Sequence, residues 1–92
     1  MKAEQQLALL KCLSDETRFK ILLMLAGDER CVCEIIEQLG MEQSLVSHHL
    51  QIMRRCKLVK FRRDGKKKMY RLADPLILKF LSDTDRLSKK FC

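Results

Sequence analysis

Five cysteines carry most of the reactive chemistry in this 92-residue sequence. Cys31 and Cys33 are separated by a single valine, and the remaining three are Cys12, Cys56 and Cys92. An odd number of cysteines at uneven spacing does not indicate a disulfide framework, so we expect reduced thiols in a cytoplasmic chain. Such thiols pack as small apolar residues, bind soft ions as thiolates, or respond to oxidation.

The closely spaced pair is the best candidate for chemistry at sulfur. In a regular helix, residues two positions apart point about 200 degrees away from each other. We therefore expect Cys31 and Cys33 to meet one ion only if the first helical turn is distorted. We favour a ligand or redox role for this pair over simple burial, and we expect Cys56 to pack in the core.

A second set of functional side chains lies between positions 44 and 55. At about 100 degrees per residue, one helix face there carries hydroxyl, imidazole, amide and guanidinium groups. These side chains are Ser44, Ser47, His48, Gln51 and Arg55. Such groups can bind phosphates and read base edges in a DNA major groove, and we expect His48 and Gln51 to read bases. An ordinary solvated helix face is the alternative.

The opposite face of the same helix is apolar apart from one histidine. Its members are Val46, His49, Leu50 and Met53. Consecutive helical residues point about 100 degrees apart, so the adjacent histidines do not predict a metal site. We expect a semi-buried structural role for His49.

Positive charge is concentrated directly after this helix. The chain has 19 Lys and Arg against 12 Asp and Glu, which gives a net charge of +7. From Arg54 to Arg71, Asp64 is the only acid among ten basic residues. A cluster of this kind attracts a phosphate backbone, and the alternative is a patch that only keeps the protein in solution.

The order of the elements predicts a single winged helix-turn-helix domain over residues 1–92, mainly α with a small β-hairpin (α+β). We expect about five helices and a two-stranded wing whose strands join through Asp64-Gly65. The predicted parts are a helix-turn-helix at about 31–56, with Gly40 ending its first helix, a wing at about 57–72, and a last helix at about 75–90.

The last helix has an apolar stripe with no obvious partner in so small a domain. Its members are Leu76, Ile77, Phe80, Leu81 and Leu87. We expect this stripe to serve in dimerisation. The chain has no run of about 18 apolar residues, so we expect no contact with a membrane.

Two spaced motifs resemble the ArsR/SmtB family of repressors. They are Leu10-Lys11-Cys12-Leu13-Ser14-Asp15-Glu16-Thr17-Arg18 and Ser44-Leu45-Val46-Ser47-His48-His49-Leu50. The match continues through Leu58-Val59 and the Gly65 wing to Tyr70-Arg71-Leu72, and it covers roughly residues 5 to 74. The resemblance implies a transcriptional repressor that binds double-stranded operator DNA as a homodimer. Its first and last helices would pair the subunits, and an inducer would release the DNA.

The segment Cys31-Val32-Cys33-Glu34 is similar to the cysteine pair of the arsenite, cadmium and lead sensors of this family. The resemblance implies As(III), Sb(III), Cd(II) or Pb(II) as inducer at Cys31 and Cys33, with no other cofactor required. Arsenic sensors with a third cysteine carry it where this chain has Ile36. A third ligand must therefore come from elsewhere, and Cys12 of the same or the partner subunit is the candidate.

The expected DNA contacts combine the helix face with the wing. They are Gln43, Ser44, Ser47, His48, Gln51, Arg54, Arg55, Arg62, Arg63, Lys66, Lys67 and Lys68.

Two other functions are alternatives. In the first, the chain is still a repressor, but its cysteines form a redox switch, with Cys56 and Cys92 as further candidates. Another is a winged-helix module that binds proteins through its apolar last helix. An enzyme is not expected, because no paired carboxylates, glycine-rich phosphate loop or Cys-His-acid set is present.

Overall fold

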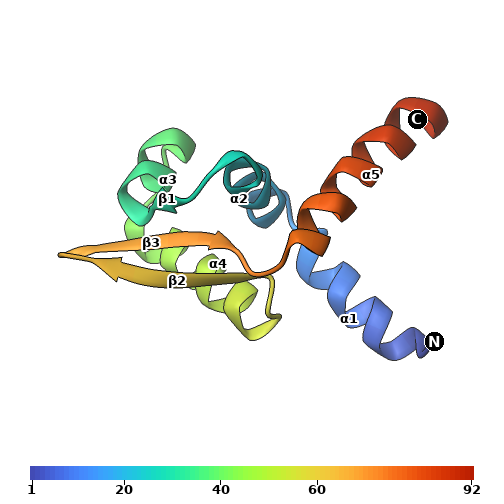
Figure 1. The fold of residues 1–92 in the computed structure, drawn as a ribbon, viewed down its shortest axis with the longest axis horizontal. Helices are drawn as coiled ribbons and strands as arrows, with labels where there is room; N and C mark the ends of the chain where they lie inside the picture. The colour runs from blue at the N-terminus through green and yellow to red at the C-terminus, as the bar shows by residue number, and fades with distance from the viewer.

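Eight elements make up the fold in the computed structural model, which describes all 92 residues (Figure 1). They are α1 (Ala3–Leu13), α2 (Glu16–Gly27), β1 (Arg30–Cys31), α3 (Val32–Leu39), α4 (Gln43–Arg55), β2 (Val59–Asp64), β3 (Lys67–Leu72) and α5 (Pro75–Phe91). The winged helix-turn-helix prediction is confirmed, with five helices in the expected order.

Local capping explains where the helices begin and end. The Asp15 carboxylate accepts a hydrogen bond from the Arg18 backbone N–H at 3.0 Å and starts α2. The Asp74 carboxylate accepts a hydrogen bond from the Leu76 backbone N–H and starts α5. Pro75 occupies the first turn of this helix, where its missing N–H costs no hydrogen bond. Gly40 ends α3 with a φ of +63°, a left-handed conformation that glycine adopts without strain.

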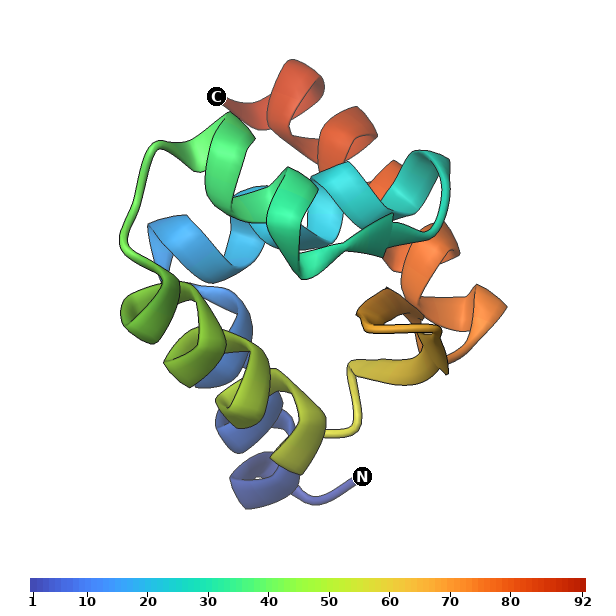
Figure 2. The same ribbon diagram turned by 90° about the vertical axis from the view of Figure 1, so that its left-hand side faces the viewer.

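Helices α3 and α4 form the helix-turn-helix, and a short connection joins them (Figure 2). Val46, Leu50 and Met53 are buried along one side of α4, as the sequence predicts. This side packs against α2, α3 and the sheet, so the orientation of α4 is set by the core. The opposite side of α4 is left free.

The sheet has three strands in the order β1-β3-β2, one more than the expected two-stranded wing. Strands β2 and β3 form the predicted antiparallel hairpin, with Gly65 at a φ of +62° in its loop. The added strand β1 pairs Arg30 with Tyr70 and Cys31 with Met69. A strand of two residues is too short to show alternation of apolar and polar side chains, so the sequence does not predict β1.

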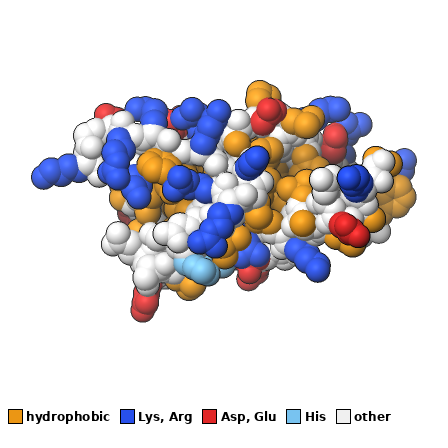
Figure 3. Space-filling model, turned by 90° about the horizontal axis from the view of Figure 1, so that it is seen from below, with side chains coloured by type: hydrophobic (Ala, Val, Ile, Leu, Met, Phe, Trp, Pro, Cys, Tyr) orange, Lys and Arg blue, Asp and Glu red, His pale blue; other side chains and the backbone are white.

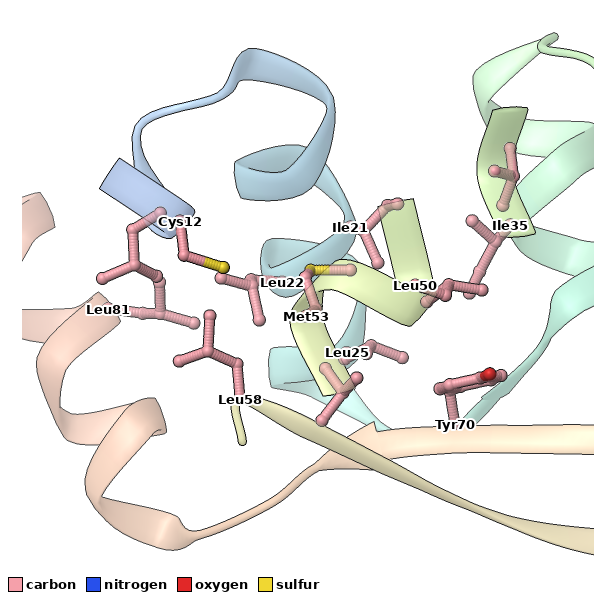
Figure 4. Close-up of a cluster of buried hydrophobic side chains, with 13 residues drawn as sticks. Cys12, Ile21, Leu22, Leu25, Ile35, Leu50, Met53, Leu58, Tyr70 and Leu81 are labelled. Atoms are coloured by element: carbon pink, nitrogen blue, oxygen red, sulfur yellow. The ribbon is translucent and has the colours of Figure 1, made fainter. Parts of the chain in front are cut away.

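A single hydrophobic core connects the helices to the sheet. It contains Cys12, Leu13, Ile21, Leu22, Leu25, Ile35, Val46, Leu50, Met53, Leu58, Val59, Tyr70 and Leu81. Figure 4 shows Cys12 and Leu81 at one end of this cluster and Ile35 and Tyr70 at the other. Most of the core therefore lies in the body formed by α2, α3, α4 and the sheet.

Helices α1 and α5 extend away from that body, with both chain termini at the same end of the molecule (Figure 1). Only Cys12 and Leu13 of α1 and Leu81 of α5 are buried. The predicted unpartnered stripe of the last helix is therefore corrected in part, because Leu81 lies in the core and Ile77 and Phe80 pack against it. Large apolar side chains remain exposed on both helices: Leu7, Leu9, Leu10, Leu76, Leu78, Leu87 and Phe91. No helix in the structure is both long enough and apolar enough to cross a membrane.

Candidate nucleic-acid interface

The free side of α4 presents the polar side chains that the sequence places there. Ser44, His48 and Gln51 are exposed, and Ser47 is half-buried. Gln51, Arg54 and Arg55 line a shallow hollow of about 370 Å³ at the C-terminal half of the helix. These groups can donate hydrogen bonds and remain accessible to a large ligand.

His49 belongs to a polar cluster that joins α4 to the start of α2. Its side chain is 13% exposed, and its Nδ1 lies 3.3 Å from Arg18 Nη1 and 3.8 Å from Asp15 Oδ2. The Arg18 backbone N–H holds the pKa of the Asp15 carboxyl below its usual value, with further help from the charges of Arg18 and His49. This arrangement agrees with the expected semi-buried structural role of His49.

The wing carries cations that have no acidic partner within the chain. Arg63, Lys66 and Lys67 are exposed and make none of the ion pairs in the structure. Figure 3 shows several lysine and arginine side chains over the wing end of the molecule, with others along the rest of this face, where hydrophobic side chains are also exposed. Unpaired cations beside the free face of α4 create a surface suited to a polyanion.

Two other expected DNA-contacting arginines also bind groups within the protein. Arg62 donates to both carboxylate oxygens of Glu29, at 3.0 Å from Nε and 2.6 Å from Nη2. This hydrogen-bonded pair lowers the pKa of Glu29. The guanidinium of Arg54 lies over the ring of Phe61, 4.5 Å from its centroid.

Those contacts connect the parts of the interface to one another. Glu29 attaches the outer strand of the wing to the loop before β1, and Phe61 attaches the wing to the end of α4. Sequence reasoning missed Glu29, which is 33 residues from Arg62 in the chain. It also missed Phe61, whose contact with Arg54 depends on how the chain turns from α4 into β2. The charge pattern identified the arginines but not their partners.

The cysteine pair lies at the start of α3, and the structure joins Cys31 to Cys33 by a disulfide. This corrects the expectation of reduced thiols for these two residues. Cys31 precedes the helix in an extended conformation, so the two side chains do not diverge as they would inside a regular helix. No distortion of the helical turn is needed for the two sulfurs to meet.

Cys31 also caps α3. Its sulfur accepts a hydrogen bond from the Glu34 backbone N–H at 3.2 Å, and the Glu34 carboxylate accepts one from the Cys31 N–H at 3.2 Å. Cys31 is 2% exposed, whereas Cys33 is exposed. The two sulfurs therefore differ in accessibility, and the buried one is attached to both the helix and the sheet.

A cleft of about 360 Å³ opens at this pair, between the start of α3, the start of α4 and the wing. Its lining contains both cysteines and Gln43 and Ser47 of α4, and the remaining side chains are Val32, Ile36, Arg63, Lys66, Lys67 and Lys68. The structure thus brings the predicted sulfur site together with part of the predicted DNA surface. The sequence places the cysteine pair at the edge of the helix-turn-helix, and the structure adds its closeness to the wing lysines.

Cys12 lies elsewhere, in the core beside Cys56. Burial raises the pKa of the Cys12 thiol to about 12, with a further contribution from the neighbouring Cys56 thiol. The structure does not bring Cys12 to the Cys31–Cys33 pair, and no three His, Cys, Asp or Glu side chains of the chain are placed to hold a metal ion. Once reduced, the Cys31–Cys33 pair offers a soft ion two cysteine sulfurs from one chain.

Comparison with known sequences identifies relatives along most of the chain. Residues 15–60 match the model of the arsR family of bacterial regulatory proteins. The chain is 38% identical over 73 residues to a transcriptional repressor SmtB homolog of Synechocystis, covering 79% of this chain and 55% of the relative. It is 34% identical over 87 residues to an uncharacterized HTH-type transcriptional regulator of Methanocaldococcus jannaschii, covering 94% and 98%.

A third relative is the arsenical resistance operon repressor of Staphylococcus aureus, 36% identical over 72 residues, which are 78% of this chain and 69% of that protein. The chain thus spans between about half and nearly all of the length of these relatives.

Solved structures share the fold over almost the whole chain. The homodimeric winged helix-turn-helix DNA-binding domain of a possible ArsR-family regulator from Mycobacterium bovis aligns with a TM-score of 0.88 at 28% identity, covering 96% of this chain and 82% of that one. Reduced HlyU from Vibrio cholerae aligns with a TM-score of 0.85 at 31% identity, covering 98% and 92%. The chain therefore belongs to the ArsR family, a family of DNA-binding transcriptional regulators and not of enzymes.

Proposed function

We propose that this chain represses transcription by binding double-stranded operator DNA as a homodimer. The observation that carries the proposal is the free polar face of α4 beside unpaired wing cations. In this proposal the exposed His48 and Gln51 read base edges, and the exposed Arg63, Lys66 and Lys67 bind phosphates. A module that only binds proteins has no need for such a concentration of positive charge.

The exposed apolar side chains of α1 and α5 support the homodimer. These helices contribute little to the core of one chain, and they extend from the same end of the molecule. Pairing them with the same helices of a second copy would bury that surface. The relative from Mycobacterium bovis is itself described as homodimeric.

Control of DNA binding is proposed to act through Cys31 and Cys33. Cys31 caps α3, pairs with Met69 in the sheet and lies in the cleft that the wing cations border. A chemical change at its sulfur would alter the cap of α3 and the strand beside the wing at once. The pair is therefore well placed to change the geometry of the DNA-binding surface.

A thiophilic metalloid or metal is the first candidate inducer: As(III), Sb(III), Cd(II) or Pb(II). Its support is the soft thiolate chemistry of the pair and the relative named as an arsenical resistance operon repressor. The ion would require both cysteines in their reduced form. Further ligands must come from another molecule or the partner subunit, because Cys12 lies in the core beside Cys56.

Oxidation of the same pair is the second candidate. The disulfide between Cys31 and Cys33 favours it, because the geometry of α3 accommodates that bond without losing the capping box. A two-electron switch of this kind needs no third ligand.

DNA binding measured by fluorescence anisotropy tests the proposal. The reduced protein is added anaerobically to a labelled duplex from its own upstream region, and then arsenite, antimonite, Cd(II), Pb(II) or peroxide is added. We expect one class of reagent to release the DNA, and Cys31→Ser and Cys33→Ser to abolish the release while binding persists. Binding that is tight but indifferent to every addition would refute control by the pair, and no specific binding would favour the protein-interaction module.

A further inference from the structure

The cleft at the cysteine pair has an unusual combination of walls. It is lined by Cys31 and Cys33 and by four cationic side chains of the wing: Arg63, Lys66, Lys67 and Lys68. No acidic side chain lines it. Any molecule that reaches the exposed Cys33 must therefore enter a strongly positive environment.

We propose that this cleft selects anionic thiol-reactive molecules, specifically small disulfides bearing carboxylates, as the oxidants of the Cys31/Cys33 pair. The proposal rests on the control site proposed above and names its substrate class. Charge complementarity carries the argument, because cations raise the local concentration of an anion and lower that of a cation. The volume of about 360 Å³ is suited to a small molecule rather than to a protein segment.

The reaction is an ordinary thiol–disulfide exchange. The Cys33 thiolate attacks one sulfur of the reagent RS–SR, which forms a mixed disulfide and releases one thiolate that takes up the proton lost by Cys33. The Cys31 sulfur then attacks the Cys33 sulfur, closes the Cys31–Cys33 disulfide and releases the second RSH. The protein dithiol is oxidised, and one reagent disulfide is reduced to two thiols.

The accessibility of the two sulfurs assigns these roles. Cys33 is exposed and can be attacked from the cleft, whereas Cys31 is 2% exposed and is reached only by Cys33. While the mixed disulfide persists, the carboxylate of its R group lies among cations that we also propose as phosphate contacts. An anionic adduct should therefore compete with DNA in a way that a neutral adduct does not.

Oxidation rates of the reduced protein test the selectivity. Three aliphatic disulfides of similar size are compared: dithiodipropionate, which is anionic, hydroxyethyl disulfide, which is neutral, and cystamine, which is cationic. Each rate is divided by the rate of the same reagent with a small free thiol, and Cys92→Ser removes the other exposed cysteine. We expect the anionic reagent to react about tenfold faster than the neutral one at low salt, with the cationic one slowest, and high salt to compress the differences.

Matched variants link this order to the cleft. Lys66→Gln/Lys67→Gln should remove most of the preference for the anion. Lys20→Gln/Lys79→Gln, with the same change in net charge at exposed positions on α2 and α5, should leave it intact. Equal normalised rates for the three reagents, or equal effects of the two double variants, would overturn the proposal.

DNA binding by trapped adducts separates this proposal from the one on which it rests. In Cys31→Ser the mixed disulfide at Cys33 cannot be resolved, and the serine hydroxyl can still cap α3. We expect the anionic adduct to weaken DNA binding more than the neutral adduct. If the Cys31–Cys33 disulfide releases DNA but both adducts bind DNA equally, the anionic inference fails while control by the pair stands. If neither the disulfide nor any adduct alters DNA binding, control by the pair fails as well.

Discussion

The wing lysines predict how strongly DNA affinity should depend on salt concentration. Lys66 and Lys67 are exposed, unpaired and next to each other at the turn of the β2–β3 hairpin. Each cation that neutralises a phosphate releases counterions, so each contact contributes about 0.9 to the slope of log affinity against log salt. Lys66→Gln/Lys67→Gln removes two contacts per protomer, or four per dimer, and the slope should become shallower by about 3.6.

A difference of about 3.6 in slope has a large effect on the measured affinity. Over a fourfold rise in salt, from about 50 to 200 mM, the native protein should lose about 150-fold more affinity than the variant. The assay is fluorescence anisotropy of one duplex at several salt concentrations under reducing conditions, with circular dichroism to check the fold. Lys20→Gln/Lys79→Gln is the control and should keep the native slope. An unchanged slope in Lys66→Gln/Lys67→Gln, or the same loss in the control, would refute a phosphate-binding role for the wing.

Three further predictions follow from individual side chains. Gln51→Ala should lose about 1–3 kcal/mol of discrimination between the operator and a scrambled duplex with little change in salt slope; a uniform loss on both duplexes would exclude base reading. Leu10→Glu should convert the proposed dimer to a monomer, because a charge replaces an apolar contact worth about 1.5–3 kcal/mol per side chain. Light scattering measures the mass, and an unchanged mass would exclude α1 from the interface. Cys12 should resist iodoacetamide at about pH 8 while Cys92 reacts, because the Cys12 thiol is buried and its raised pKa leaves very little of it as the reactive thiolate; equal alkylation of the two cysteines would contradict this. The same shift should make the fold less stable as pH rises from the ordinary value of 9.0 toward about 12, because Cys12 ionises in the unfolded chain before it ionises in the folded one; a denaturant midpoint that does not fall over this range would contradict it.

Local signals in the sequence predict most of the fold. Asp15 and Asp74 indicate helix starts, Gly40 indicates a helix end, and the apolar spacing of α4 separates its buried and free faces. Each signal works because the cause lies within a few residues of the effect. Strand β1 has no such signal, because its two residues become a strand only by pairing with β3.

The candidate site is only partly readable from the sequence. Spacing identifies Cys31 and Cys33 as a pair, but a helical extrapolation separates their sulfurs, since it places Cys31 inside the helix that it actually caps. Their closeness to Lys66 and Lys67 depends on how the hairpin folds back over α3, which no local pattern encodes. The bond between Arg62 and Glu29 is likewise a product of tertiary structure, because the two residues are far apart in the chain.

A footprint on the upstream region of the chain's own coding sequence tests the central claim most directly. Hydroxyl-radical cleavage of that DNA is compared with and without the reduced protein. A homodimer that places one α4 in each of two major grooves should protect two symmetric half-sites whose centres lie about 10 base pairs, or a multiple of that distance, apart. Uniform cleavage at protein concentrations that saturate a nonspecific duplex, or a single protected half-site, would contradict the proposal of an operator-binding dimer.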